Sequence, residues 1–290
     1  MFERLGLIGC GLMGGSFALA LKRAGLVRSV VGFSPSASTR QRALQLGVID
    51  EAAASPAVAA TGADLVLVAV PVGAIESTLA AIAEQVTAST LVMDVGSTKS
   101  DVVAAARRAM LAQLSSFVPA HPVAGKELSG IDHADAGLYA GRQVVLTPTE
   151  VTGDAQLVRA RALWAALGCK VVTMTPQAHD AAFAAVSHLP HLVAFALMNA
   201  IGAQSRGDEF LALAGPGFRD FTRIAASEPS MWCDILLGNR EQVLVQSQQL
   251  QRALQELERL IASADAQALR AQIANASAAR AQWRMGGQQD

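Results

Sequence analysis

The glycine-rich segment GLIGCGLMGGS, near the N-terminus, limits the fold of this chain more than any other feature of its sequence. Gly9, Gly11 and Gly14 have the spacing G-x-G-x-x-G and close a short apolar run, Leu5–Gly9, which predicts a strand. In dinucleotide-binding proteins the first glycine permits a tight turn, the second lets the backbone approach a pyrophosphate, and the third lets a helix pack against the strand. The helix predicted over Met13–Arg23 would present free N–H groups to the phosphates. The sequence therefore predicts a nucleotide-binding unit at its start.

The first half of the chain repeats this alternation of apolar runs and helical patterns. The segment DLVLVAV is apolar almost throughout, as expected for a strand covered by helices on both faces. Such alternation is typical of a mostly parallel sheet in an α/β, Rossmann-type domain, which we predict over residues 1–176. The other predicted strands are Ser29–Phe33, Asp64–Val70, Thr90–Val95, Phe117–Ala120, Gln143–Thr147 and Lys170–Thr173, and the other predicted helices are Ala37–Leu46, Gly73–Val86, Lys99–Leu114 and Ala155–Leu167.

The second half has a different pattern, without strand-like runs. Long Ala-, Leu- and Gln-rich segments, broken at Pro190 and Pro229, predict an all-helical domain over residues 177–290. Apolar residues repeat at helical spacing after Arg240 and need a covering surface, either within the chain or on a second copy. Dimers are the commonest oligomers of soluble proteins, so we expect this domain to form a homodimer, and we also expect substrate binding from it. The residues of the stripe are Leu250, Leu254, Leu257 and Ile261.

The composition excludes several other classes of protein. Hydrophobic residues make up 52% of the 290 and charged residues 16%, with a net charge of −1. The basic excess typical of nucleic-acid binding is missing, as are signal-peptide features and any uninterrupted apolar stretch of about 18 residues. The three cysteines are far apart and lack metal-site spacing. We expect a soluble cytoplasmic protein with reduced thiols and no metal, nucleic-acid or membrane partner.

The end of the second predicted strand bears on the choice of nucleotide. NAD enzymes usually have Asp or Glu about 20 residues after the glycine loop, where it accepts from the ribose 2′-hydroxyl. That position is Ser34 here, and no acid follows before Asp50. Ser34 can donate to a 2′-phosphate, and Arg40 can pair with it unless it is only a solvated helix residue. NADP is therefore favoured over NAD. The other positions at which cofactor contacts are expected are Leu12, Met13, Val70 and Pro71.

Two segments of the first half carry residues suited to catalysis. HPVAGKELSG, which we expect to be a loop, contains His121 and Glu127, and a histidine can act as a general base at neutral pH. DVGSTKSD is a strand-to-helix turn at the carboxyl edge of the predicted sheet, where open α/β sheets bind ligands. It offers Ser97 and Lys99.

Two segments of the second half add cationic and titratable groups. VSHLPHLVAFAL places His188 and His191 on a helix that we expect proline to break. GFRDFTRIA contains Arg219, Asp220 and Arg223, and the last two share a helical face because they are three residues apart.

These segments resemble one known family. GLIGCGLMGGS, DVGSTK, HPVAGKELSG, LTPTE, SHLPHLVAFAL and GFRDFTRIAASEPSMW, in this order, resemble the prephenate/arogenate dehydrogenase family of tyrosine biosynthesis. The resemblance covers residues 5 to about 262 and suggests the stand-alone form of the enzyme. It implies oxidation of the ring C4 alcohol of prephenate, hydride transfer to the nicotinamide and loss of the ring carboxylate as CO₂, giving 4-hydroxyphenylpyruvate. Arogenate, or both substrates, remains the alternative.

The resemblance also implies roles for individual residues. His121 would be the general base, Ser97 would form hydrogen bonds near the same hydroxyl, and Glu127 would lie at the mouth of the site. Arg223 would bind a substrate carboxylate, and His191 the side-chain end of the substrate, which favours prephenate.

Other residues are assigned less specific roles. Asp220 would pair with the arginine three residues on or hold the loop, and Trp232 would pack. His188 is equally compatible with a core position and with the site, whereas His133 and His179 are expected at the surface.

Three other classes of protein fit the sequence less well than this family. β-Hydroxyacid dehydrogenases need a catalytic lysine in the second domain, but no lysine follows Lys170. A pyrroline-carboxylate reductase would not need the histidine segment. A non-enzymatic NADP sensor would tolerate the loss of His121.

Overall fold

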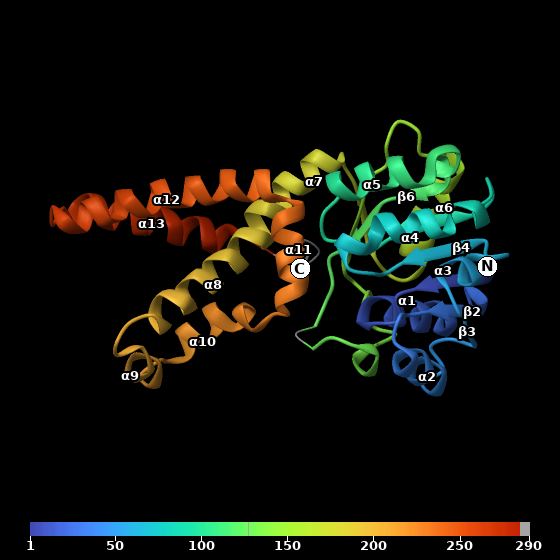
Figure 1. The fold of residues 1–290 in the computed structure, drawn as a ribbon. Helices are drawn as coiled ribbons and strands as arrows, with labels where there is room; N and C mark the ends of the chain where they lie inside the picture. The colour runs from blue at the N-terminus through green and yellow to red at the C-terminus, as the bar shows by residue number, and fades with distance from the viewer. Residues whose placement is uncertain (127, 285–290) are drawn as a thin grey trace.

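Six parallel strands form the larger sheet of the N-terminal half (Figure 1). The computed structural model describes residues 1–126 and 128–284. The strand order β3-β2-β1-β4-β5-β6 is that of a Rossmann domain, with the chain reversing direction of travel between β1 and β4. The strands are β1 (Phe2–Ile8), β2 (Val27–Phe33), β3 (Glu51–Ala52), β4 (Leu65–Val68), β5 (Leu91–Asp94) and β6 (Phe117–Val118).

Helices cover both faces of this sheet. In β4, Leu65 and Leu67 join one hydrophobic core while Val66 and Val68 join the other, as a doubly covered strand requires. The predicted α/β class with a mostly parallel sheet is thus confirmed. The helices of this half are α1 (Leu12–Arg23), α2 (Ala37–Gln45), α3 (Pro56–Ala60), η1 (Val72–Ala74), α4 (Ile75–Ile82), η2 (Ala83–Gln85), α5 (Ser100–Met110), η3 (Leu111–Ser116), η4 (Ile131–His133) and α6 (Asp154–Ala166).

A second, three-stranded sheet follows the first. It consists of β7 (Ala120–Pro122), β8 (Gln143–Leu146) and β9 (Lys170–Thr173), with β7 antiparallel and β9 parallel to β8. The loop predicted around His121 was wrong, because His121 lies in β7 opposite Val145. Pro119 separates β6 from β7: it has no N–H for the ladder of the first sheet, and its carbonyl accepts from Thr147 N (3.0 Å) instead.

The C-terminal half is helical. One helix runs without a break from Pro176 to Gly202, so the break predicted at Pro190 was wrong. A π-helical turn directly before Leu189 accommodates the proline, which cannot donate a helical hydrogen bond. The elements are α7 (Pro176–Phe183), η5 (Ala184–His188), α8 (Leu189–Gly202), α9 (Gly207–Ala212), α10 (Pro216–Thr222), η6 (Arg223–Ala226), α11 (Pro229–Gly238), α12 (Arg240–Ala262) and α13 (Ala266–Gln282).

The helix from Pro176 to Gly202 is long and apolar enough to cross a membrane by length and composition, although only 22% of its most apolar window is buried. Helices of soluble proteins meet the same criteria, so this is weak evidence for a membrane span. The helix also carries His179 and Asp180, whose polar side chains are buried against the α/β half. Much of the apolar surface of this helix is therefore left uncovered by the rest of the described chain.

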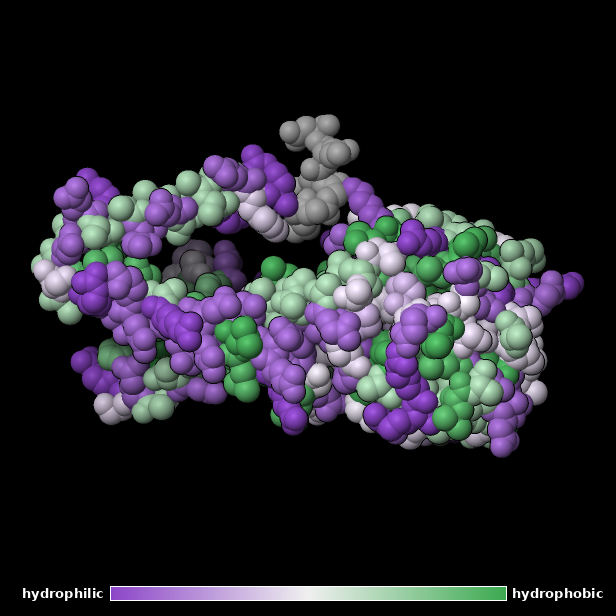
Figure 2. Space-filling model, turned by 90° about the horizontal axis from the view of Figure 1, so that it is seen from above, coloured by the Kyte–Doolittle hydropathy of each residue, from purple (hydrophilic) through white to green (hydrophobic). Residues whose placement is uncertain are grey.

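The paired helices α12 and α13 extend away from the α/β half (Figure 1). Their apolar side chains are not covered by the chain itself: Leu254 is 53% exposed and Ile261 63%. Hydrophobic residues are visible along the helical half in the space-filling view (Figure 2). Within the described residues, packing inside one chain therefore does not account for the predicted stripe.

Candidate active site

The glycine loop has the geometry that a dinucleotide requires. Gly9 has a φ of +101°, and a Cβ there would lie 2.2 Å from the carbonyl oxygen of Ala69. A Cβ on Gly14 would lie 2.0 Å from the oxygen of Gly9, because helix α1 packs closely on the strand. At Gly11, by contrast, no described atom outside the adjoining chain lies within 4 Å of such a Cβ. The free space at Gly11 fits the close approach of a pyrophosphate.

The phosphates would meet the N-terminus of α1. Leu12 and Met13 are its first two residues, and Gly11 at the N-cap position provides no side chain to occupy their N–H groups. Unpaired N–H groups and the helix dipole favour an anion at this point. Val70 and Pro71 follow β4 beside the same loop, since Ala69 N donates to Ile8 O across 2.7 Å. The structure therefore gathers the predicted cofactor residues of β1, α1 and β4 at one edge of the sheet.

Ser34 and Arg40 lie together at the end of β2. The Arg40 guanidinium donates to the carbonyl oxygens of Ser34 and of Pro35 (3.2 Å), and it lies over the ring of Phe33. Arg40 is half-buried and folds back onto the loop, so it is not merely a solvated helix residue. The place where NAD enzymes usually have an acid thus carries a fixed cation.

Lys99 and Asp94 form a fully buried ion pair behind the site. Lys99 Nζ also donates to the carbonyl of Ala120 (3.0 Å), and Asp94 accepts from the N–H groups of Ala120 (2.9 Å) and Gly96 (2.8 Å). Buried charges are tolerated when hydrogen bonds satisfy them in this way. The pair fastens strand β7 to the turn that carries the half-buried Ser97.

His121 is the first member of a buried chain of hydrogen bonds. Its Nδ1 lies 2.8 Å from Nε2 of His179, and Nδ1 of His179 lies 2.8 Å from Oδ1 of Asp180. His179 is fully buried, so its predicted surface position was wrong. The sequence signal for this contact is weak: a His-Asp pair one turn into the first helix after the domain junction.

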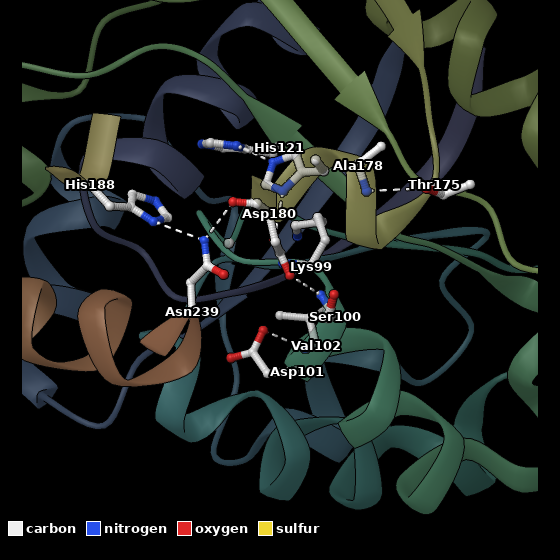
Figure 3. A network of polar contacts seen from close by, with 12 residues as sticks. Lys99, Ser100, Asp101, Val102, His121, Thr175, Ala178, Asp180, His188 and Asn239 are labelled. Atoms are coloured by element: carbon white, nitrogen blue, oxygen red, sulfur yellow. Dashed lines mark hydrogen bonds and ion pairs between the residues drawn. The ribbon is translucent and has the colours of Figure 1, made fainter. Parts of the chain in front are cut away.

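Asp180 connects the two halves of the molecule. Its carboxylate accepts from the N–H groups of Lys99 and Ser100, each at 2.8 Å, in the first turn of α5 (Figure 3). The Asn239 amide donates to the Asp180 carbonyl (2.8 Å) and lies 3.1 Å from Nδ1 of His188. A residue of α7 therefore caps α5, a helix 80 residues earlier in the chain.

Burial determines the charge state of these groups. It lowers the pKa of His121 well below its usual value, and the positive potential of His179, Lys99 and His188 lowers it further. Burial also lowers the pKa of His179, against the opposing effect of Asp180. For Asp180, burial opposes ionisation, but hydrogen bonds from His179, Ser100 and Lys99 leave its pKa below the usual value. Two neutral imidazoles and one carboxylate result at neutral pH.

A cleft of about 460 Å³ opens between the segment after β7 and the helical half. Basic groups from three segments line it, together with small and apolar residues. The lining residues are Gly125, Lys126, Leu128, His133, His191, Arg223, Ile224 and Ser227.

His191 and Arg223 meet in this cleft. The His191 ring stacks on Trp232 with 3.5 Å between ring centroids, and its Nδ1 donates to the carbonyl of Ser187 (2.9 Å). Burial lowers the pKa of His191, and the nearby Arg223 lowers it further. Lys126 adds a second cation, held by Asp135 at 3.0 Å. The cleft is therefore suited to an anionic ligand.

Asp220 and His188, both named from the sequence, do not line the cleft. Asp220 is exposed, pairs with Arg219 (3.1 Å) and is not among the described lining residues. Glu127 lies outside the described residues. His188 is buried: burial lowers its pKa to about 4, and its Nε2 has no hydrogen-bond partner within the described chain. His133, expected at the surface, is half-buried at the cleft.

Fold and site together define a class. A Rossmann sheet with an open glycine loop, joined to a helical half through a basic cleft, is the arrangement of a nicotinamide-dependent dehydrogenase. Among the described residues no group of three or more His, Cys, Asp or Glu side chains is placed to hold a metal ion. Residues 17–173 match the family model "Prephenate dehydrogenase, nucleotide-binding domain", and residues 175–275 match "Prephenate dehydrogenase, dimerization domain". The chain belongs to the prephenate dehydrogenase family.

Individual relatives agree with this assignment. The prephenate dehydrogenase of Bacillus subtilis (strain 168) is 34% identical over 278 residues, which cover 93% of this chain and 73% of the relative. The prephenate dehydrogenase of A. aeolicus, solved with hydroxyphenyl propionate and NAD+, is 34% identical with a TM-score of 0.90 over 97% of both chains. Synechocystis arogenate dehydrogenase is 30% identical, with a TM-score of 0.82 over 97% of this chain and all of the other.

Proposed function

We propose that this protein is a prephenate dehydrogenase, which converts prephenate to 4-hydroxyphenylpyruvate and CO₂. The observation that carries the proposal is the buried imidazole of His121, which directly follows the residue that Lys99 binds at the carboxyl end of β5. His121 does not itself line the cleft, but the same segment reaches the cleft at Gly125, opposite Arg223. When bound, the cofactor supplies the hydride acceptor for the C4 hydrogen. His121 takes the proton of the C4 hydroxyl, and the ring carboxylate leaves as CO₂ as the ring becomes aromatic. Ser97, in the turn fastened to β7, hydrogen-bonds the same hydroxyl.

The charge of the cleft supports prephenate over arogenate. Prephenate has two carboxylates, whereas arogenate has an additional ammonium group and a smaller net negative charge. Arg223 binds one carboxylate as a charged fork. Lys126 and His191 face the side-chain end, where a second cation disfavours an ammonium group. Glu127, which lies outside the described residues, and Asp220 remain proposed as substrate-binding residues.

The cofactor is proposed to be NADP, with NAD as the alternative. Ser34 and the fixed guanidinium of Arg40 take the place of the acid that NAD enzymes use at the end of β2. We further propose a dinucleotide-binding domain over residues 1–176 and a substrate-binding domain over residues 177–290. The second domain matches a model described as a dimerization domain, which supports a homodimer through the exposed helices. We also propose that the protein is cytoplasmic.

A steady-state assay tests these assignments. Prephenate or arogenate would be combined with NAD or NADP, and reduced nicotinamide followed at pH 8. We expect the highest kcat/KM with prephenate and NADP. Folded protein that binds the nucleotide but turns over neither substrate would contradict the proposed activity.

His121→Asn tests the general base. We expect unchanged cofactor affinity and a kcat lower by about 10²–10⁴. Because burial lowers the pKa of His121, the native base stays deprotonated into mildly acidic solution. The acid limb of the native kcat/KM profile should thus lie below the ordinary histidine pKa of about 6.5. Unaltered kcat in the variant would remove His121 from the mechanism.

A further inference from the structure

The hydrogen bonds around Asp180 determine where the protons of its neighbours lie. An ionised carboxylate can only accept, and this one accepts from the N–H groups of Lys99 and Ser100. Its Oδ1 also lies 2.8 Å from Nδ1 of His179. Nδ1 of His179 must therefore carry a proton.

The same argument then determines the position of the proton on His121. A neutral His179 with its proton on Nδ1 has a lone pair on Nε2, which lies 2.8 Å from Nδ1 of His121. Two lone pairs cannot face each other at this distance without a hydrogen between them. Nδ1 of His121 therefore carries a proton, and its Nε2 holds the lone pair.

We propose that His179 and Asp180 are positioning residues that hold His121 as the Nδ1–H tautomer, so that Nε2 is the atom that takes the substrate proton. The inference rests on the proposed function only in naming His121 as the base. In the step itself, the hydroxyl proton moves to Nε2 as hydride leaves C4, and Nδ1–H continues to donate to His179. Asp180 then faces an imidazolium across one neutral ring and stabilises it.

Packing leaves these rings little freedom to adopt another arrangement. His179 stacks on Phe183 with 4.4 Å between centroids, and His121 lies 4.6 Å from the same ring. His121 and His179 are 7% and 0% exposed, so water does not compete for the contact between Nδ1 of His121 and Nε2 of His179. The other charged or titratable groups that act on His121 are Lys99 and His188.

Nitrogen NMR of the unmodified protein measures the tautomer directly. The chain has five histidines, and the His121 signals are those missing from the His121→Asn spectrum. At pH 8 we expect a protonated Nδ1 and an unprotonated Nε2 in long-range ¹H–¹⁵N correlations. The reverse pattern, or fast averaging of both, would overturn the proposal. The spectrum needs no substrate, so it stands or falls separately from the proposed reaction.

A pair of variants tests the effect on the reaction. His179→Leu removes the acceptor, whereas the amide oxygen of His179→Gln can still accept from Nδ1 of His121. We expect about 10²-fold lower kcat for His179→Leu at unchanged KM for the nucleotide, and recovery of most of this loss in His179→Gln. Equal kcat in both variants, or a His179→Leu kcat within about twofold of the native value, would refute the positioning role. If His179→Leu fails to fold, the tautomer of His121 measured by NMR in the unmodified protein still tests the proposal.

Discussion

At the scale of single residues, the site separates groups that bind from groups that hold other groups in place. Arg223, His191 and Lys126 line the cleft, whereas Lys99 and Asp180 are buried behind it and contact no solvent. The sequence motifs pointed to Arg223, His191 and Lys99, but not to Lys126 or Asp180. A basic residue at a motif position can be recognised from the sequence. The contact between His121 and His179 joins positions 58 residues apart and forms only because α7 packs on the α/β half.

The two arginines of the segment GFRDFTRIA provide a prediction with an internal control. Arg223→Ala should raise KM for prephenate by about 30-fold or more, because a substrate carboxylate would lose its charged partner. Arg219 is exposed and paired with Asp220, outside the described cleft lining, so Arg219→Ala should leave KM within about twofold. Steady-state kinetics at saturating nucleotide measure both. A larger KM effect from Arg219→Ala would place the carboxylate site on the other side of α10.

At the scale of elements, strands and helices of the α/β half could be predicted because their apolar periodicity reflects burial on two faces. Two failures have a local origin. Pro119 ends one sheet and starts another, which moved His121 from an expected loop into a strand, and Pro190 is accommodated by a π-helical turn where a break was expected. In both places a proline lacks the backbone N–H that a regular strand or helix would use, and apolar periodicity does not show how the chain accommodates this loss.

The buried ion pair between Asp94 of β5 and Lys99, at the start of α5, provides a prediction at this scale. Lys99→Met should lower the free energy of unfolding by about 3–5 kcal/mol, because Asp94 would remain charged, buried and without its cation. Lys126→Met removes a cation whose pair with Asp135 is largely exposed, and should cost no more than about 1 kcal/mol. Urea denaturation of both variants measures the difference. Equal losses would mean that the buried pair contributes no more than a surface one.

At the scale of the whole molecule, the helical half has apolar faces that the rest of the described chain does not cover. Leu254 and Ile261 are more than half exposed on a helix that projects away from the α/β half (Figure 1). Exposed apolar surface of this extent is typical of an interface. The sequence pattern showed that the stripe needed a cover, but periodicity is the same whether the cover comes from the chain or from a second copy.

A charge in this stripe should separate the proposed dimer. We expect the double variant Leu254→Glu/Ile261→Glu to have the mass of a monomer, because each carboxylate would have to be buried without a partner. Gln251→Glu, on the same helix at an exposed polar position, should remain a dimer. Light scattering after size exclusion measures the mass. A native protein that is already monomeric at micromolar concentration would contradict the homodimer.

The attachment of Asp180 to the N-terminus of α5 has a consequence for the order in which the chain is made. A ribosome synthesises the strands of the larger sheet and α5 before it synthesises α7. At that moment the N–H groups of Lys99 and Ser100 lack their acceptor, and His121 lacks the ring that orients it. The two groups that α7 supplies to the first half, a carboxylate for the start of α5 and a ring for His121, are therefore delivered only late in translation.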